Sequence, residues 1–96
     1  MLTGRQKRFL RSEAHQLKPI FQVGKTGVNE NMTTQISEAL EKRELIKVSI
    51  LQNCMEDKFQ VAEALEDGTG AHVVQIIGNT IILYKESMTN QEIELP

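Results

Sequence analysis

The sequence predicts a single α/β domain in which a four-stranded mixed β-sheet is flanked by helices, and two patterns support this prediction. Segments with the apolar period of a helix alternate with short segments that have the period of a strand, in the order α-β-α-β-α-β-β. The last two strand segments are separated only by Gly78-Asn79, a pair that suits a type II′ hairpin turn. Strands joined through helices favour parallel pairing, and the hairpin adds an antiparallel pair.

The first helix is expected from about residue 4 to Leu17. Thr3-Gly4-Arg5-Gln6 has the form of a capping box, in which the Thr hydroxyl accepts from the third helical amide and the Gln side chain reaches back. Pro19 disfavours helical backbone at Lys18, which sets the other end. Helical spacing gathers apolar residues on one face and leaves a basic stripe on the other, made of Arg5, Lys7, Arg8, Arg11, His15 and Lys18.

The middle of the chain predicts a strand, a helix and a second strand. Residues 19–23 form a short strand candidate, and Asn29 is a suitable N-cap for a second helix. Apolar residues at helical spacing extend this helix to about residue 43. The period then changes to that of a half-buried strand over residues 44–51. One face is expected to carry Ile46, Val48 and Ile50, and the other Leu45, Lys47 and Ser49.

A third helix and a hairpin complete the predicted order. The helix is expected over about Met55 to Asp67, ending at Gly68-Thr69-Gly70, with its buried positions at Met55, Phe59, Ala62 and Leu65. Two apolar strands follow, over residues 73–77 and 80–84. The tail, residues 86–96, is polar apart from isolated apolar residues, and its pattern predicts no element.

Charge is divided unevenly along the chain. Residues 1–28 carry six basic side chains and one acidic side chain, a net charge of +5, whereas residues 29–96 carry five basic and twelve acidic side chains, a net charge of −7. The formal net charge of −2 therefore conceals a basic end and an acidic remainder. This asymmetry indicates that a polyanion docks on one surface.

The segment Gly24-Lys25-Thr26-Gly27 lies within the basic third of the chain, between the first strand and the second helix. Glycine accepts positive φ and lets an anion approach the backbone N–H groups, while Lys25 supplies charge and Thr26 a hydroxyl. The pattern is typical of a clamp on a nucleic-acid backbone. An ordinary strand-to-helix turn explains these four residues equally well.

Other chemistry is not supported by the spacing. A nucleotide-binding P-loop would need glycine where this chain has Pro19. The candidate metal ligands His15, Cys54 and His72 show no ligand spacing, and no nucleophile with a base can be singled out. We therefore expect no enzyme activity, metal or cofactor. No apolar run approaches the roughly 20 residues of a membrane span, which favours a cytoplasmic protein.

Several motifs in the same order resemble a known family. They are Leu17-Lys18-Pro19, the glycine segment 24–27, Glu44-Leu45-Ile46-Lys47-Val48, Val74-Gln75-Ile76-Ile77-Gly78 and Leu83-Tyr84-Lys85. Together they resemble, over about residues 2–85, the CRM domain (chloroplast RNA splicing and ribosome maturation) in its bacterial single-domain, YhbY-like form. The resemblance implies a sheet and helices similar to the C-terminal domain of translation initiation factor three. It also implies RNA binding through the glycine segment and association with precursor large ribosomal subunits. Lys85 stands where many members have arginine, whose bidentate contact lysine does not make.

The residues predict structured RNA as the ligand, bound by a monomer that contacts the phosphates and shape of the RNA. The resemblance implies that this RNA is ribosomal precursor RNA. We expect the RNA-binding residues to be Gly24, Lys25, Thr26, Gly27, Lys18, Arg5, Arg8 and Arg11, with Lys47 as a secondary candidate. Base stacking has weak support, since Phe9 and Phe59 have core-like helical positions. Phe21 and Tyr84 are left as candidate stacking platforms, but the core is the preferred assignment for both. The alternative is an adaptor that binds an assembly protein through its acidic surface, and an RNA-processing enzyme ranks third.

Overall fold

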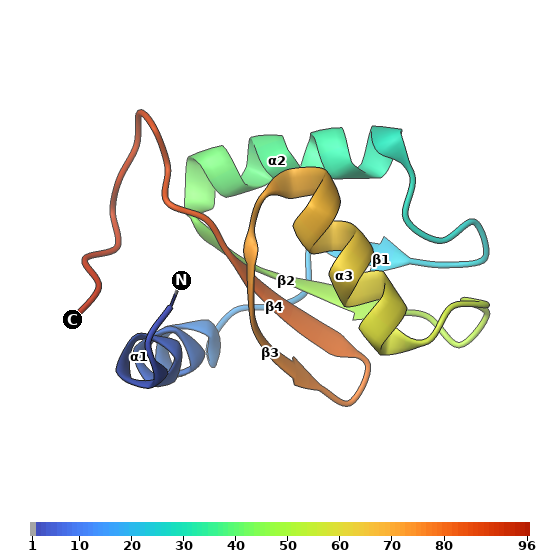
Figure 1. The fold of residues 1–96 in the computed structure, drawn as a ribbon, viewed down its shortest axis with the longest axis horizontal. Coiled ribbons are helices and arrows are strands. Elements are labelled where there is room, and N and C mark those ends of the chain that lie inside the picture. The colour runs from blue at the N-terminus through green and yellow to red at the C-terminus, as the bar shows by residue number, and fades with distance from the viewer. Residues whose placement is uncertain (1) are drawn as a thin grey trace.

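The predicted element order is confirmed in a computed structural model that describes residues 2–96. Three helices and four strands follow one another in the order α-β-α-β-α-β-β (Figure 1). Their bounds are α1 Gly4–Ala14, β1 Phe21–Val23, α2 Glu30–Arg43, β2 Leu45–Ile50, α3 Lys58–Thr69, β3 His72–Ile77 and β4 Thr80–Tyr84.

The four strands form one mixed sheet in the order β1-β2-β4-β3. β1 pairs with β2 in parallel, as expected for strands joined through a helix, and β4 pairs antiparallel with both β2 and β3. At the hairpin turn Gly78 has a φ of +56°, the positive value that the first central position of a type II′ turn requires. The hairpin thus returns the chain into the sheet beside β2.

The helices cover both faces of the sheet. On one face α2 and α3 bury an apolar core with β2 and β4, around Ile36, Leu65 and Val48. On the other face α1 packs Leu10 and Ala14 on a second, smaller core. This second core also contains Leu45, which the half-buried pattern had placed on the more exposed face of its strand. Leu45 is buried because α1 covers the start of β2.

The first helix begins as predicted and ends early. The capping box is present, with Gln6 N–H donating to Thr3 Oγ1 at 3.1 Å and Thr3 N–H donating to Gln6 Oε1 at 3.0 Å. The helix ends at Ala14 rather than Leu17, because Leu17 N–H donates to the Ala14 carbonyl in a turn that leads the chain toward β1. Leu17 is consequently exposed.

The third helix begins later than predicted, and two of its expected core residues are on the surface. Asp57 is the N-cap and forms a capping box with Gln60, so the helix starts at Lys58 instead of Met55. Met55 therefore precedes the helix and is 86% exposed. The packed stripe contains Val61, Ala62, Leu65 and Thr69. Phe59 lies roughly a third of a turn away from this stripe and is 66% exposed.

The tail, which the sequence pattern left unplaced, is held by two carboxylates. Glu44, at the positive-φ residue after α2, is fully buried and accepts hydrogen bonds from the N–H groups of Ser87, Glu92 and Ile93 at 2.7–2.9 Å. Glu41, one turn earlier, accepts four more from residues 87–89. Ile93 and Leu95 pack against the α1 core.

These contacts predict an acid-sensitive tail. The Met88 N–H group, together with groups of Ser87 and Thr89, lowers the pKa of Glu41 from 4.5 to about 2. Because the folded-state pKa is depressed, its stabilising contribution is complete above about pH 4.5 and is lost as the pH falls toward 2. We expect Glu41→Gln to lower the urea midpoint at pH 7 and to differ progressively less from the wild type below pH 4.5. Glu38→Gln, at an exposed site on the same helix, is the control and should leave the midpoint unchanged. A constant difference at all pH values would contradict this assignment.

Candidate nucleic-acid interface

The glycine segment 24–27 forms a tight turn at one end of the molecule. It lies in the connection between β1 and α2, at the right of Figure 1. Gly27 N–H donates to the Gly24 carbonyl at 3.0 Å, and Gly27 has a φ of +68°. Lys25 and Thr26 are exposed at the tip. Within residues 2–96 their amide N–H groups donate to no other residue, so both are free to donate to an anion.

The connection between β2 and α3 packs against this turn, and the sequence did not indicate this contact. Leu51 N–H donates to the Val23 carbonyl at 2.9 Å, and a Cβ on Gly24 would lie 3.5 Å from Leu51 Cδ1. A Cβ on Gly27 would collide with the carboxylate of Glu56. The positive φ is what favours glycine at position 27, because the exposed Glu56 side chain could move aside for a methyl group. Glu56 also puts negative charge beside Gly27, so a phosphate meets less repulsion on the Lys25–Thr26 side.

The basic stripe of α1 is not adjacent to this turn. Arg5 and Arg8 are exposed and Arg11 is half-buried on α1. Figure 1 shows α1 toward one end of the long axis and the glycine turn toward the other. The long axis of the molecule measures 37 Å. A ligand that contacts both must therefore extend along the protein.

Two lysines lie between these ends, on the face of the sheet that α1 covers in part. Lys47 Nζ donates to the Leu17 carbonyl at 3.0 Å, and Ile20 N–H donates to the Lys47 carbonyl at 3.1 Å. The segment that contains Lys18 therefore runs beside β2 at Lys47. Farther along this face, Gln22 and Ser49 pair across β1 and β2 and are at least partly exposed. These polar residues continue the surface toward the glycine turn.

Lys85 has a structural role in this arrangement. Its Nζ donates to the Thr69 carbonyl at 2.8 Å, at the carboxyl end of α3. A cation at this position satisfies a terminal carbonyl and interacts favourably with the helix dipole.

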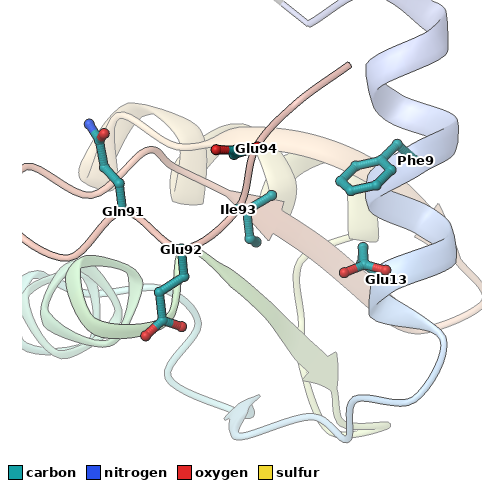
Figure 2. A pocket seen from close by; sticks show the side chains of 6 residues that line it. All are labelled: Phe9, Glu13, Gln91, Glu92, Ile93 and Glu94. Carbon is teal, nitrogen blue, oxygen red and sulfur yellow. The ribbon is translucent and has the colours of Figure 1, made fainter.

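A hollow between α1 and the tail has the wrong charge for a phosphate backbone. Figure 2 shows Phe9 and Glu13 extending from α1, opposite Gln91, Glu92, Ile93 and Glu94 of the tail. Three of these six lining side chains are carboxylates. The hollow therefore repels a polyanion.

Residues 2–96 hold neither a metal-binding cluster nor a membrane-spanning helix. Among residues 2–96, no three His, Cys, Asp or Glu side chains lie close enough together to hold a metal ion. No helix in the described part of the chain is long and apolar enough to cross a membrane.

Comparison with known proteins decides the family. The sequence model of the CRS1 / YhbY (CRM) domain family matches residues 2–85, which include the glycine turn and the four strands of the sheet. The chain belongs to the CRM domain family. The expected resemblance is thereby confirmed.

The relatives of this CRM domain carry names that refer to RNA binding. It is 72% identical to "Probable RNA-binding protein YqeI" of Bacillus subtilis (strain 168) over the whole of both chains. It is 37% identical to "RNA-binding protein" of Haemophilus influenzae over 99% of this chain and 95% of the relative. The solution structure of hypothetical protein SAV1595 from Staphylococcus aureus superimposes over the whole of both chains, with a TM-score of 0.83 and 58% identity. The names of the two curated relatives denote RNA-binding proteins rather than enzymes.

Proposed function

We propose that this CRM domain binds ribosomal precursor RNA through its glycine turn and takes part in assembly of the large ribosomal subunit. In this proposal the protein acts as a cytoplasmic monomer and has no catalytic role. The observation that carries the proposal is the turn itself, in which Lys25 and Thr26 present unpaired backbone N–H groups, a cation and a hydroxyl at one exposed tip. Nucleic-acid phosphates are recognised by these groups.

The cations away from the turn extend the proposed contact. The segment that contains Lys18 runs beside β2 at Lys47, and Arg5, Arg8 and Arg11 lie on α1. A structured RNA that lies along the 37 Å axis would meet these groups in succession. Contacts to phosphate and shape give affinity without reading sequence, so RNA structure selects the binding site.

Crosslinking in cells, followed by sequencing of the bound RNA, tests the proposed role. We expect precursor RNA of the large ribosomal subunit to be enriched, and enrichment to be lost in Lys25→Glu. Uniform recovery of messenger RNA would contradict an assembly role. An adaptor would instead co-sediment with large-subunit precursors while giving few RNA crosslinks, and Lys25→Glu would leave its co-sedimentation intact.

A further inference from the structure

Three large apolar side chains are exposed around the start of α3. They are Leu51, Met55 and Phe59, which we call the 51–59 patch and which are 39%, 86% and 66% exposed. They lie within one nine-residue segment that leads into α3, and exposed apolar groups that gather on one surface of a small domain often mark an interaction site. Their exposure also distinguishes Phe59 from Phe9, Phe21 and Tyr84, which pack fully or partly into the two cores.

The segment that carries the 51–59 patch meets the glycine turn at two points. Leu51 lies directly under Gly24, and Glu56, between Met55 and Phe59 in the chain, touches Gly27. Ile77 is exposed as well, but it is not part of this patch. It is the cross-strand partner of Thr80, and Thr80 is the partner of Ser49, so all three lie on the face of the sheet that α1 covers in part. A chain that crosses the turn at Lys25 and Thr26 can therefore place its side groups over this patch.

The chemistry around the patch favours nucleobases as the occupant. Lys58 Nζ lies 5.7 Å from the centroid of the Phe59 ring, so a cation accompanies the aromatic surface. The ring remains largely exposed despite this contact. Bases stack on aromatic rings regardless of sequence, while nearby lysines neutralise the phosphates.

We propose that unpaired bases of the RNA stack on Phe59 and pack against Met55 while their phosphates cross the Lys25–Thr26 turn. This inference rests on the proposed RNA binding and narrows its ligand to RNA with a loop, bulge or single-stranded end. Bases held within a continuous duplex cannot be splayed onto a side chain in this way. The protein therefore binds looped RNA more tightly than a duplex of the same stem.

The test compares a fluorescently labelled hairpin RNA that has an unpaired loop with a fully paired duplex of its stem. Phe59→Ala should weaken hairpin binding by about fivefold or more, the usual effect of removing a stacking aromatic, and should leave duplex binding unchanged. Phe59→Tyr should retain hairpin affinity. Met88→Ala is the control, because Met88 is 86% exposed but lies in the tail, which is held at Glu41 near the end of α2 away from the glycine turn. Urea unfolding of each variant checks that the fold is intact.

A direct readout comes from Phe59→Trp, since the chain contains no other tryptophan. We expect its fluorescence to be quenched by the hairpin and unaffected by the duplex. Unchanged hairpin affinity in Phe59→Ala, together with weakened binding in Lys25→Glu, would overturn base stacking and leave backbone binding in place. Failure of the wild type to bind either RNA would overturn both. If Phe59→Ala abolishes co-sedimentation with ribosomal precursors but preserves RNA affinity, the occupant is a protein and the proposal is wrong.

Discussion

Lys25→Glu is expected to weaken RNA binding by at least about tenfold at roughly 0.1 M salt. A lysine that neutralises one phosphate steepens the decline of log affinity with log salt by about 0.7–0.9. For a tenfold change in salt, from 1 M to 0.1 M, this lysine therefore increases the affinity by about five- to eightfold. Reversing the charge adds repulsion to this loss. Lys25 is exposed at the tip of the turn, so the substitution should not disturb folding. Fluorescence anisotropy with a structured fragment of ribosomal RNA measures the change.

Two further variants make this result specific. Lys42→Glu changes an equally exposed lysine in the last turn of α2, at the end of that helix away from the glycine turn, and should have little effect (Figure 1). Arg8→Glu tests the basic stripe on α1. Because α1 and the turn lie toward opposite ends of the long axis, the losses in Lys25→Glu and Arg8→Glu should multiply in the double variant. Equal losses in Lys25→Glu and Lys42→Glu would indicate a general charge effect instead of a site.

Gly27→Ala is expected to destabilise the fold and distort the glycine turn. Its φ of +68° disfavours any side chain by about 1–2 kcal/mol, and the new methyl group would also collide with Glu56. The loss should appear as a lower urea midpoint, accompanied by weaker RNA binding under conditions where the variant is folded.

Two substitutions separate the causes of that loss. Glu56→Ala removes the contact and leaves the backbone strain, so the double variant should recover little of the lost stability, because the exposed Glu56 side chain can already move aside in Gly27→Ala. Gly4→Ala is the control, because a Cβ on Gly4, the first residue of α1, meets no atom within 4 Å. Its stability should be unchanged or slightly higher, since alanine favours helix. Wild-type stability in Gly27→Ala would contradict the described geometry of the turn.

Local chemistry made much of the fold predictable from the sequence. The capping box at Thr3 and the N-cap at Asn29 act within one helical turn, and both helices start where these residues place them. The start of α3 was predicted wrongly. The spacing of apolar residues placed it at Met55, whereas the capping box of Asp57 and Gln60 starts the helix at Lys58. That error put Phe59 in the core, and it concealed the exposed patch beside the glycine turn.

Long-range contacts were beyond reach of the sequence pattern. The hydrogen bonds from Ser87 to Glu41 and Glu44 join residues more than 40 positions apart, so no local period indicates where the tail lies. The packing of Glu56 under Gly27 likewise joins separate loops. The sequence shows that the cations of α1 and the glycine turn both lie within the first 28 residues. Closeness in sequence does not specify closeness in space, and the fold places α1 and the turn toward opposite ends of the molecule (Figure 1).

The salt dependence of RNA affinity in the wild type and in Lys25→Ala tests the central claim most directly. The account predicts a linear decline of log affinity with log salt in the wild type, with a slope of about −0.7 to −0.9 for each phosphate neutralised. Lys25→Ala should make that slope shallower by about 0.7–0.9, the contribution of one phosphate. A salt-independent affinity in the wild type, or an unchanged slope in Lys25→Ala, would contradict binding of the RNA backbone at the glycine turn.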